Sequence, residues 1–106
     1  MKYLRFTLTL SGAAEPTSSV LRVGIEESEV LVMFEGYGLV VTRDELRRHL
    51  DAPIGASEMP FEVTHRQRGM LQTFPDKQGG GLRWRTSPSY TWKMSEEDRS
   101  KLLGEL

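Results

Sequence analysis

The stretch SVLRVGIEESEVLVMF, residues 19–34, decides the fold, because its pattern specifies both a β-hairpin and the register of that hairpin. The polar residues 26–29 form the expected turn. Around that turn every facing pair is apolar: Leu21 with Phe34, Val23 with Val32, and Ile25 with Val30. The second strand is also apolar on its other face, at Leu31 and Met33, which predicts a central strand that is covered on both faces.

Alternating sequence predicts further strands on both sides of this hairpin. Residues 3–10 alternate between apolar and polar side chains, as a strand with one buried face requires. Shorter strands are expected at residues 39–41, 61–65, 69–74, 82–86 and 90–94. Glycine, proline and small polar residues predict loops at residues 11–18, 35–38, 51–60 and 75–81. The three consecutive glycines that end the last of these predict a flexible loop.

Two helix starts complete the prediction of the fold. Thr42 is followed three residues later by Glu45, which is the capping-box pattern. Ser95, followed by three acidic residues, starts a second helix near the end of the chain. We therefore expect a single α+β domain over residues 1–106, with a mainly antiparallel sheet of about six or seven strands and two short helices.

A second hairpin, LRWRTSPSYTWKM at residues 82–94, concentrates aromatic and basic side chains. A three-residue turn, Ser-Pro-Ser, places Trp84 opposite Trp92 on one face of this hairpin. The same register places Arg83 opposite Lys93 on the other face. The alternation therefore favours packed tryptophans and a separate cationic face over a surface that mixes aromatic and basic groups.

Positive charge is segregated into one third of the chain. The formal net charge is −1, yet residues 61–94 contain six Lys and Arg against two Asp and Glu. Residues 1–60 contain nine acidic residues against six basic ones. This segregation predicts either a contact surface for an acidic partner or a basic face that is simply solvated. Its members are Arg66, Arg68, Lys77, Arg83, Arg85 and Lys93.

Few residues in the sequence are suited to catalysis or metal binding. The chain contains no cysteine, which excludes disulfides, thiolate nucleophiles and cysteine metal sites. It has no HxxxH motif, no carboxylate spacing typical of a calcium loop and no Gly-x-Ser-x-Gly motif. The three glycines are not followed by the Lys-Ser/Thr of a phosphate-binding loop. We therefore expect no metal, no cofactor and no enzymatic activity.

The N-terminal residues 1–10 alternate in polarity and do not form the apolar run of a signal peptide. No segment contains the roughly 18 consecutive apolar residues of a membrane span. A soluble, cytoplasmic protein that does not contact a membrane is the expectation.

These features favour a small binding or inhibitor-type protein whose basic sheet face contacts an acidic surface, most simply that of a partner protein. Nucleic-acid binding by the same basic and aromatic hairpin is the alternative. A third hypothesis is a phosphodiester-cleaving enzyme centred on His65 with Glu62 and Arg66, although strand residues three apart point to opposite faces. His49, in the last turn of the first helix, is explained by the helix dipole. Self-association through an edge strand also stays open.

Overall fold

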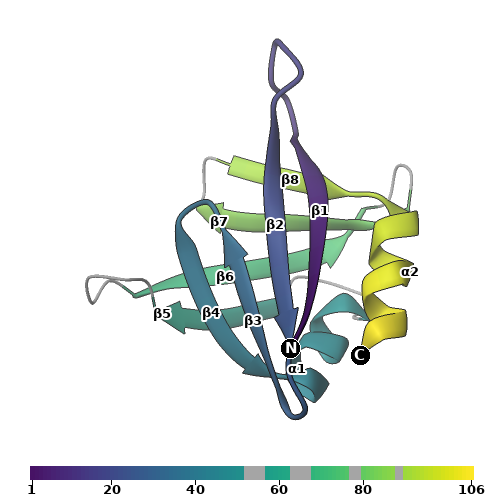
Figure 1. Ribbon diagram of the computed structural model, residues 1–106. Helices are drawn as coiled ribbons and strands as arrows, with labels where there is room; N and C mark the ends of the chain where they lie inside the picture. The colour runs from purple at the N-terminus through teal and green to yellow at the C-terminus, as the bar shows by residue number, and fades with distance from the viewer. Residues whose placement is uncertain (52–56, 63–67, 77–79, 88–89) are drawn as a thin grey trace.

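The computed structural model describes the backbone of residues 1–51, 57–62, 68–76, 80–87 and 90–106, and the side chains of these residues other than 37, 57–62, 68–71 and 86–87. The described strands are β1 (Lys2–Leu10), β2 (Ser18–Ile25), β3 (Glu29–Phe34), β4 (Tyr37–Thr42), β5 (Ser57–Glu62), β6 (Arg68–Pro75), β7 (Leu82–Ser87) and β8 (Tyr90–Met94) (Figure 1). The described helices are α1 (Arg43–Leu50) and α2 (Glu96–Glu105).

These strands form one antiparallel sheet in the order β4-β3-β2-β1-β8-β7-β6-β5. The expected combination of an antiparallel sheet with two helices is confirmed, and strands dominate it. The sheet has eight strands, where about six or seven were expected, because every short alternating segment of the chain finds a neighbour to pair with.

The sheet curls sharply where β1 meets β8. These strands pair at only two positions, Thr9 with Lys93 and Leu10 with Trp92. The half made of β1–β4 therefore crosses the half made of β5–β8 at a steep angle, and the edge strands β4 and β5 approach each other (Figure 1). Both helices lie together at one end of the curled sheet.

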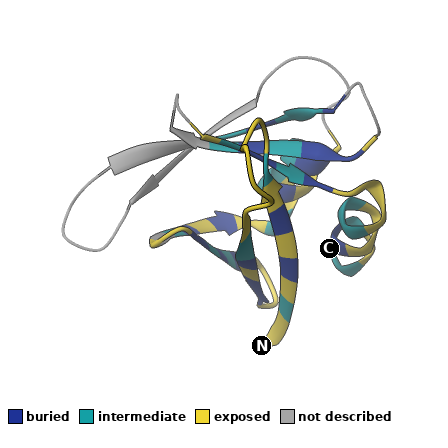
Figure 2. Ribbon diagram, turned by 90° about the horizontal axis from the view of Figure 1, so that it is seen from above, coloured by how far each residue is buried: buried dark blue, intermediate teal, exposed yellow. Residues whose placement is uncertain are grey.

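The curl encloses one hydrophobic core. Buried and exposed residues alternate along β1, so that one face of this strand points into the core (Figure 2). Leu46 and Leu50 of α1 and Leu102 of α2 join the same buried cluster. Each fully buried leucine contributes roughly 1.5–3 kcal/mol to stability, which is what attaches these short helices to the sheet.

Local predictions that depend on alternation and capping are confirmed. Ile25 faces Val30 in the first hairpin, and Trp84 faces Trp92 in the second. The hydroxyl oxygen of Thr42 accepts a hydrogen bond from the Glu45 backbone nitrogen at 3.1 Å, which caps α1. The Ser95 hydroxyl caps α2 in the same way, accepting from the Asp98 nitrogen at 3.1 Å.

Three predicted boundaries are wrong. β5 begins at Ser57, inside the expected loop 51–60, because this edge strand pairs with β6 and an edge tolerates a proline. The expected turn 35–38 is shorter, since Tyr37 already pairs with Phe34 in β4. The expected Ser-Pro-Ser turn is also shorter, because its first serine still pairs with Tyr90 after a register shift.

The prediction that β3 is covered on both faces is also wrong. Val30, Val32 and Phe34 are buried, but Leu31 and Met33 on the other face are partly exposed. The sheet curls around the first face only, and both helices also pack against the enclosed core. Apolar composition on both faces of a strand therefore does not mean that both faces are covered.

Candidate functional site

The cations of the second hairpin lie outside because the tryptophans occupy the inside. Trp84 is fully buried and Trp92 is 6% exposed, and the two face each other across β7 and β8. Alternation then directs Arg83, Arg85 and Lys93 to the outer surface of the sheet. The structure thus brings together three of the six predicted contact residues, and we call these three the basic face.

A buried carboxylate neutralises part of the basic face. Asp76 Oδ2 lies 3.2 Å from Lys93 Nζ, and Asp76 Oδ1 lies 3.6 Å from Arg83 Nη2. The Asp76 side chain is 1% exposed, whereas those of Arg83 and Lys93 are 34% and 41% exposed. Arg83 and Lys93 face each other across the strands, where two like charges alone would repel. Asp76 therefore stabilises the pair and holds both cations in position.

Phe74 belongs to this surface, although nothing in the sequence pattern indicated it. Phe74 lies opposite Arg83 in the register of β6 and β7, and it is half-buried. The Arg85 guanidinium carbon stands 5.3 Å from the centre of its ring, which is cation–π geometry. The neighbouring Thr73 is buried opposite Trp84. Apolarity alone would place Phe74 inside and Thr73 outside, and only the pairing with β7 reverses them.

The start of α2 positions the segment that carries Asp76. The Asp76 backbone nitrogen donates to the Gly81 carbonyl at 3.1 Å, and the Gly81 nitrogen donates to Glu96 Oε2 at 2.7 Å. Glu96 also pairs with Arg99 at 2.8 Å. The bond from Gly81 is the main cause that lowers the pKa of the Glu96 carboxyl, partial burial opposes it, and Arg99 lowers the pKa further. The carboxylate form is thus favoured in the fold.

Two of the three loop glycines, Gly80 and Gly81, are described, and both lie against the start of α2. Gly80 packs against Glu96, and Gly81 is buried with its nitrogen bound to the same carboxylate. Their φ angles of +72° and +83° show why glycine is needed here. Residues 77–79 lie outside the described part of the chain.

The other predicted contact residues are not placed at the basic face. Arg66 and Lys77 lie outside the described residues, as does His65, the centre of the enzyme hypothesis. Arg68 begins β6, opposite Glu62 of β5, and its side chain is not among those described.

His49 is the histidine whose surroundings the structure describes, and it lies against the sheet. The Thr73 hydroxyl donates to the His49 carbonyl at 3.2 Å, and His49 Nδ1 lies 3.3 Å from the same hydroxyl oxygen. The hydroxyl has a single proton, so when it donates to the His49 carbonyl its oxygen accepts from Nδ1, and the proton of the neutral ring is then on that nitrogen. Burial and then the positive charge of Arg48 lower the pKa of His49, while Glu45 raises it.

Replacing His49 by asparagine, which keeps a donor near Nδ1, is expected to flatten the dependence of stability on pH between pH 7 and pH 5. The folded-state pKa lies below the usual 6.5, so the unfolded chain takes up this proton first as the pH falls. The stability that the neutral ring contributes is therefore complete above pH 6.5 and is lost as the pH falls through the folded pKa. Urea unfolding at several pH values in this range measures the free energy of unfolding of both proteins. Equal slopes of this free energy against pH in the wild type and the variant would contradict the prediction.

The described part of the chain contains no cluster of three or more His, Asp or Glu side chains that could hold a metal ion. Neither described helix combines the length and the apolar composition that a membrane span requires. Comparison of the chain with protein-family models, with curated proteins and with solved structures found no significant match.

Proposed function

We propose that this protein is a non-enzymatic binding or inhibitor-type protein and that its basic face contacts an acidic surface on a partner protein. The observation that supports this is the separation of the second hairpin into a buried tryptophan side and an outer side bearing Arg83, Arg85 and Lys93. Partly exposed cations on the outer side of a sheet can meet carboxylates directly.

The contacts within the basic face favour recognition of carboxylates. Asp76 holds Arg83 and Lys93, and the ring of Phe74 supports Arg85, so the side chains lose less freedom when a partner binds. Together Asp76 and the basic face carry a formal charge of +2 on a chain with a net charge of −1. Such a balance confines the attraction for anions to this surface.

Nucleic-acid binding by the same surface is the second candidate, and Phe74 is the observation that favours it. Proteins that bind single strands combine cations with an aromatic ring on one exposed surface. Phe74, with Arg85 over its ring, provides this combination, whereas the buried tryptophans do not. Tyr90, at the start of β8, is 53% exposed and is a further aromatic group of this hairpin, although alternation places it on the side of Trp92.

Both candidates are tested by reversing Arg83 and Arg85 to glutamate and measuring binding to poly-glutamate and to a single-stranded oligonucleotide. We expect the wild-type protein to bind poly-glutamate and the double variant to bind at least about tenfold more weakly. The matched control reverses Arg48 and Lys101, two exposed cations of α1 and α2, and should bind as the wild type does. Circular dichroism verifies that each variant is folded.

The two candidates differ in the preferred probe and in salt dependence. Stronger binding of the oligonucleotide than of poly-glutamate would support nucleic-acid binding. The logarithm of the affinity should then fall by roughly one unit for each phosphate contact when the salt concentration rises tenfold. Equal binding of either probe by the wild type and by the Arg83 and Arg85 variant would remove the basic face from both proposals.

A further inference from the structure

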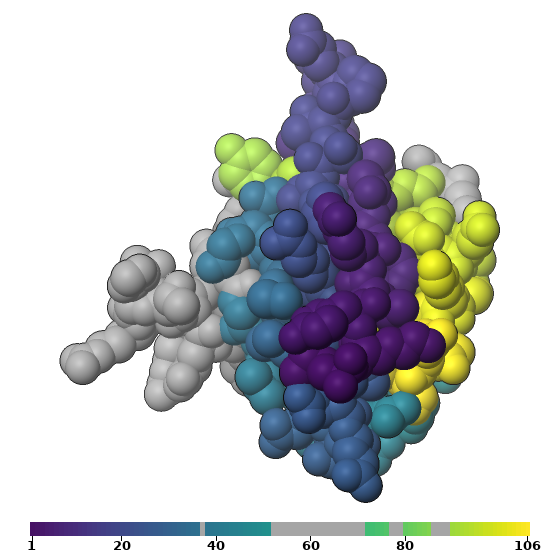
Figure 3. Space-filling view, viewed as in Figure 1, coloured from purple at the N-terminus to yellow at the C-terminus, as the bar shows by residue number. Residues whose placement is uncertain are grey.

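The outer face of β1–β4 carries a row of apolar residues that no described element covers. Tyr3, Gly24, Leu31 and Val40 lie side by side in the register of the four strands. Tyr3 is 66% exposed and Val40 is 62% exposed, Leu31 is partly exposed, and Gly24 is buried against Tyr3 and Met1. Gly24 leaves room for the neighbouring side chains, since a Cβ there would meet Tyr3 and Met1. We call these four residues the apolar row, and the face that carries them is turned to the viewer in Figure 3.

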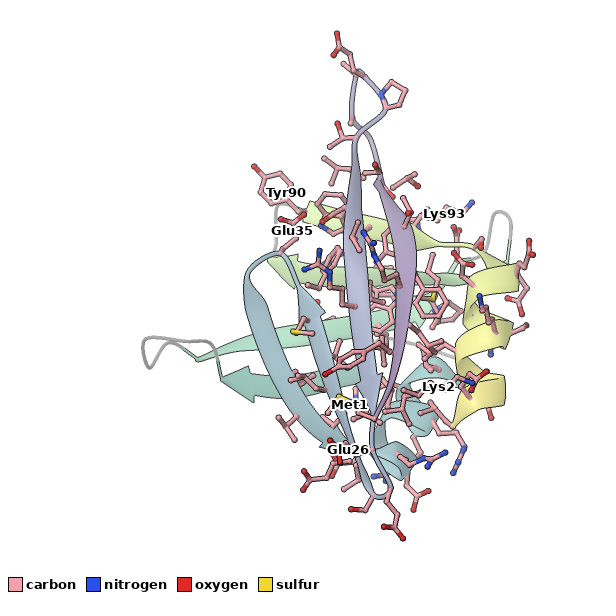
Figure 4. The ribbon with its side chains drawn as sticks, viewed as in Figure 1. Met1, Lys2, Glu26, Glu35, Tyr90 and Lys93 are labelled. Carbon is pink, nitrogen blue, oxygen red and sulfur yellow. The ribbon has the colours of Figure 1, made fainter. Side chains whose placement is uncertain are left out.

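Opposite charges lie on the two sides of the apolar row. On one side of the apolar row, two residues away from Tyr3 and Gly24, Arg5 lies directly opposite Arg22. Two residues in the other direction, Glu26 and Glu29 flank the turn that joins β2 to β3, and Figure 4 shows Glu26 beside Met1 at this end of the face. All four charged side chains are exposed, and none of them has an ion-pair partner among the described residues.

The arrangement is unfavourable in an isolated chain. Like charges directly opposite each other on neighbouring strands destabilise a sheet, and Arg5 and Arg22 are such a pair. An exposed apolar patch that is bordered by charges is typical of a surface that contacts another protein. A partner for this face therefore needs an apolar centre with acidic groups on one side and basic groups on the other.

We propose that the partner is a second copy of this chain, bound face to face about a two-fold axis that runs along the apolar row. A rotation of 180° about that axis places each apolar row on the other and exchanges its two sides. Arg22 of one copy then faces Glu26 of the other, and the two-fold symmetry generates two such pairs in the dimer. Sheets that pack face to face lie about 10 Å apart, a gap that an arginine and a glutamate side chain span together.

The charge pattern selects a second copy over other partners. The arginine side and the glutamate side lie at equal distances from the apolar row, two residues along β2 in each direction. A uniformly acidic protein would be attracted to Arg5 and Arg22 but repelled by Glu26 and Glu29. Arg22 and Glu26 are complementary to the same two residues of a second copy, as a two-fold interface requires.

Sedimentation velocity over a concentration range reaching the millimolar level tests the proposal. We expect a monomer–dimer equilibrium in the wild type. Arg22→Glu and Glu26→Arg should each raise the dimer dissociation constant by roughly tenfold to a hundredfold, because each variant places two pairs of like charges across the axis. Mixing the two variants should restore a dimer, since the charges of the mixed pair are again opposite. Lys101→Glu changes the net charge as Arg22→Glu does and should leave the dimer intact.

A protein that stays monomeric at every concentration would overturn the proposal. A dimer that Arg22→Glu does not weaken, or that the mixture of variants does not restore, would show that another surface joins the copies. The basic face of β7 and β8 is not altered by these variants, so the outcome is independent of the proposed function.

Discussion

Replacing Gly81 by alanine is expected to lower the free energy of unfolding by about 3 kcal/mol or more. A Cβ on Gly81 would lie 2.1 Å from the Met94 carbonyl oxygen and 2.9 Å from the Glu96 backbone nitrogen. Both are backbone atoms of the junction between β8 and α2, so neither can rotate away. The φ of +83° adds to the cost, because this conformation is unfavourable for alanine by about 1–2 kcal/mol.

Gly12→Ala is the matched control for this prediction. Gly12 has a similar φ of +77°, but a Cβ on it would have no neighbour within 4 Å. Its replacement should therefore show only the conformational cost of about 1–2 kcal/mol. Urea unfolding of both variants separates the two contributions. Equal losses of stability in both would mean that the close approach of Gly81 to Met94 does not constrain the fold.

Replacing Asp76 by asparagine is expected to lower the free energy of unfolding by about 2 kcal/mol. The amide keeps the shape of the side chain but removes the negative charge between Arg83 and Lys93. These cations then face each other without an anion between them. Because both side chains are partly exposed, water screens their repulsion, and the loss stays below the 3–5 kcal/mol typical of a fully buried pair.

Asp44→Asn is the matched control, because Asp44 pairs with Arg47 at 2.8 Å but is 84% exposed. An exposed pair of this kind contributes about 0.5 kcal/mol or less to stability.

The binding assay gives a second measurement for Asp76→Asn, in which the expected change is a gain in affinity and not a loss. Asp76→Asn leaves the basic face with one more net positive charge. We expect this gain to outweigh the lost positioning of Arg83 and Lys93, so the variant should bind poly-glutamate more tightly while unfolding more easily. Unchanged stability would contradict the role given to Asp76, and weaker binding by the folded variant would contradict the proposed function.

The parts of the fold that were predictable are those that neighbouring residues control. The register of the first hairpin follows from a short polar turn and from apolar residues at every second position, such as Ile25 and Val30. The starts of both helices follow from single hydroxyl side chains, Thr42 and Ser95, that satisfy a free backbone nitrogen. The outward direction of Arg83, Arg85 and Lys93 follows from the same alternation.

The chemical state of the basic face was not predictable in this way. Asp76 was counted among the acidic residues of its segment, but nothing near it in the sequence indicates that it is buried between two cations from β7 and β8. Phe74 lies outside and Thr73 lies inside because β6 pairs with β7, and that pairing joins segments separated by a loop. The apolar row combines residues from four strands, so its exposure depends on the direction in which the whole sheet curls.

The hairpin registers, the helix caps and the side of each strand on which its cations lie follow from the amino-acid sequence. Each of these depends on interactions between residues that are close along the chain, where alternation and turn length leave few choices. Which charges are neutralised and which apolar face stays uncovered depend on the tertiary structure. Charge pairing and burial depend on segments that are distant along the chain, and the curl between β1 and β8 brings those segments together.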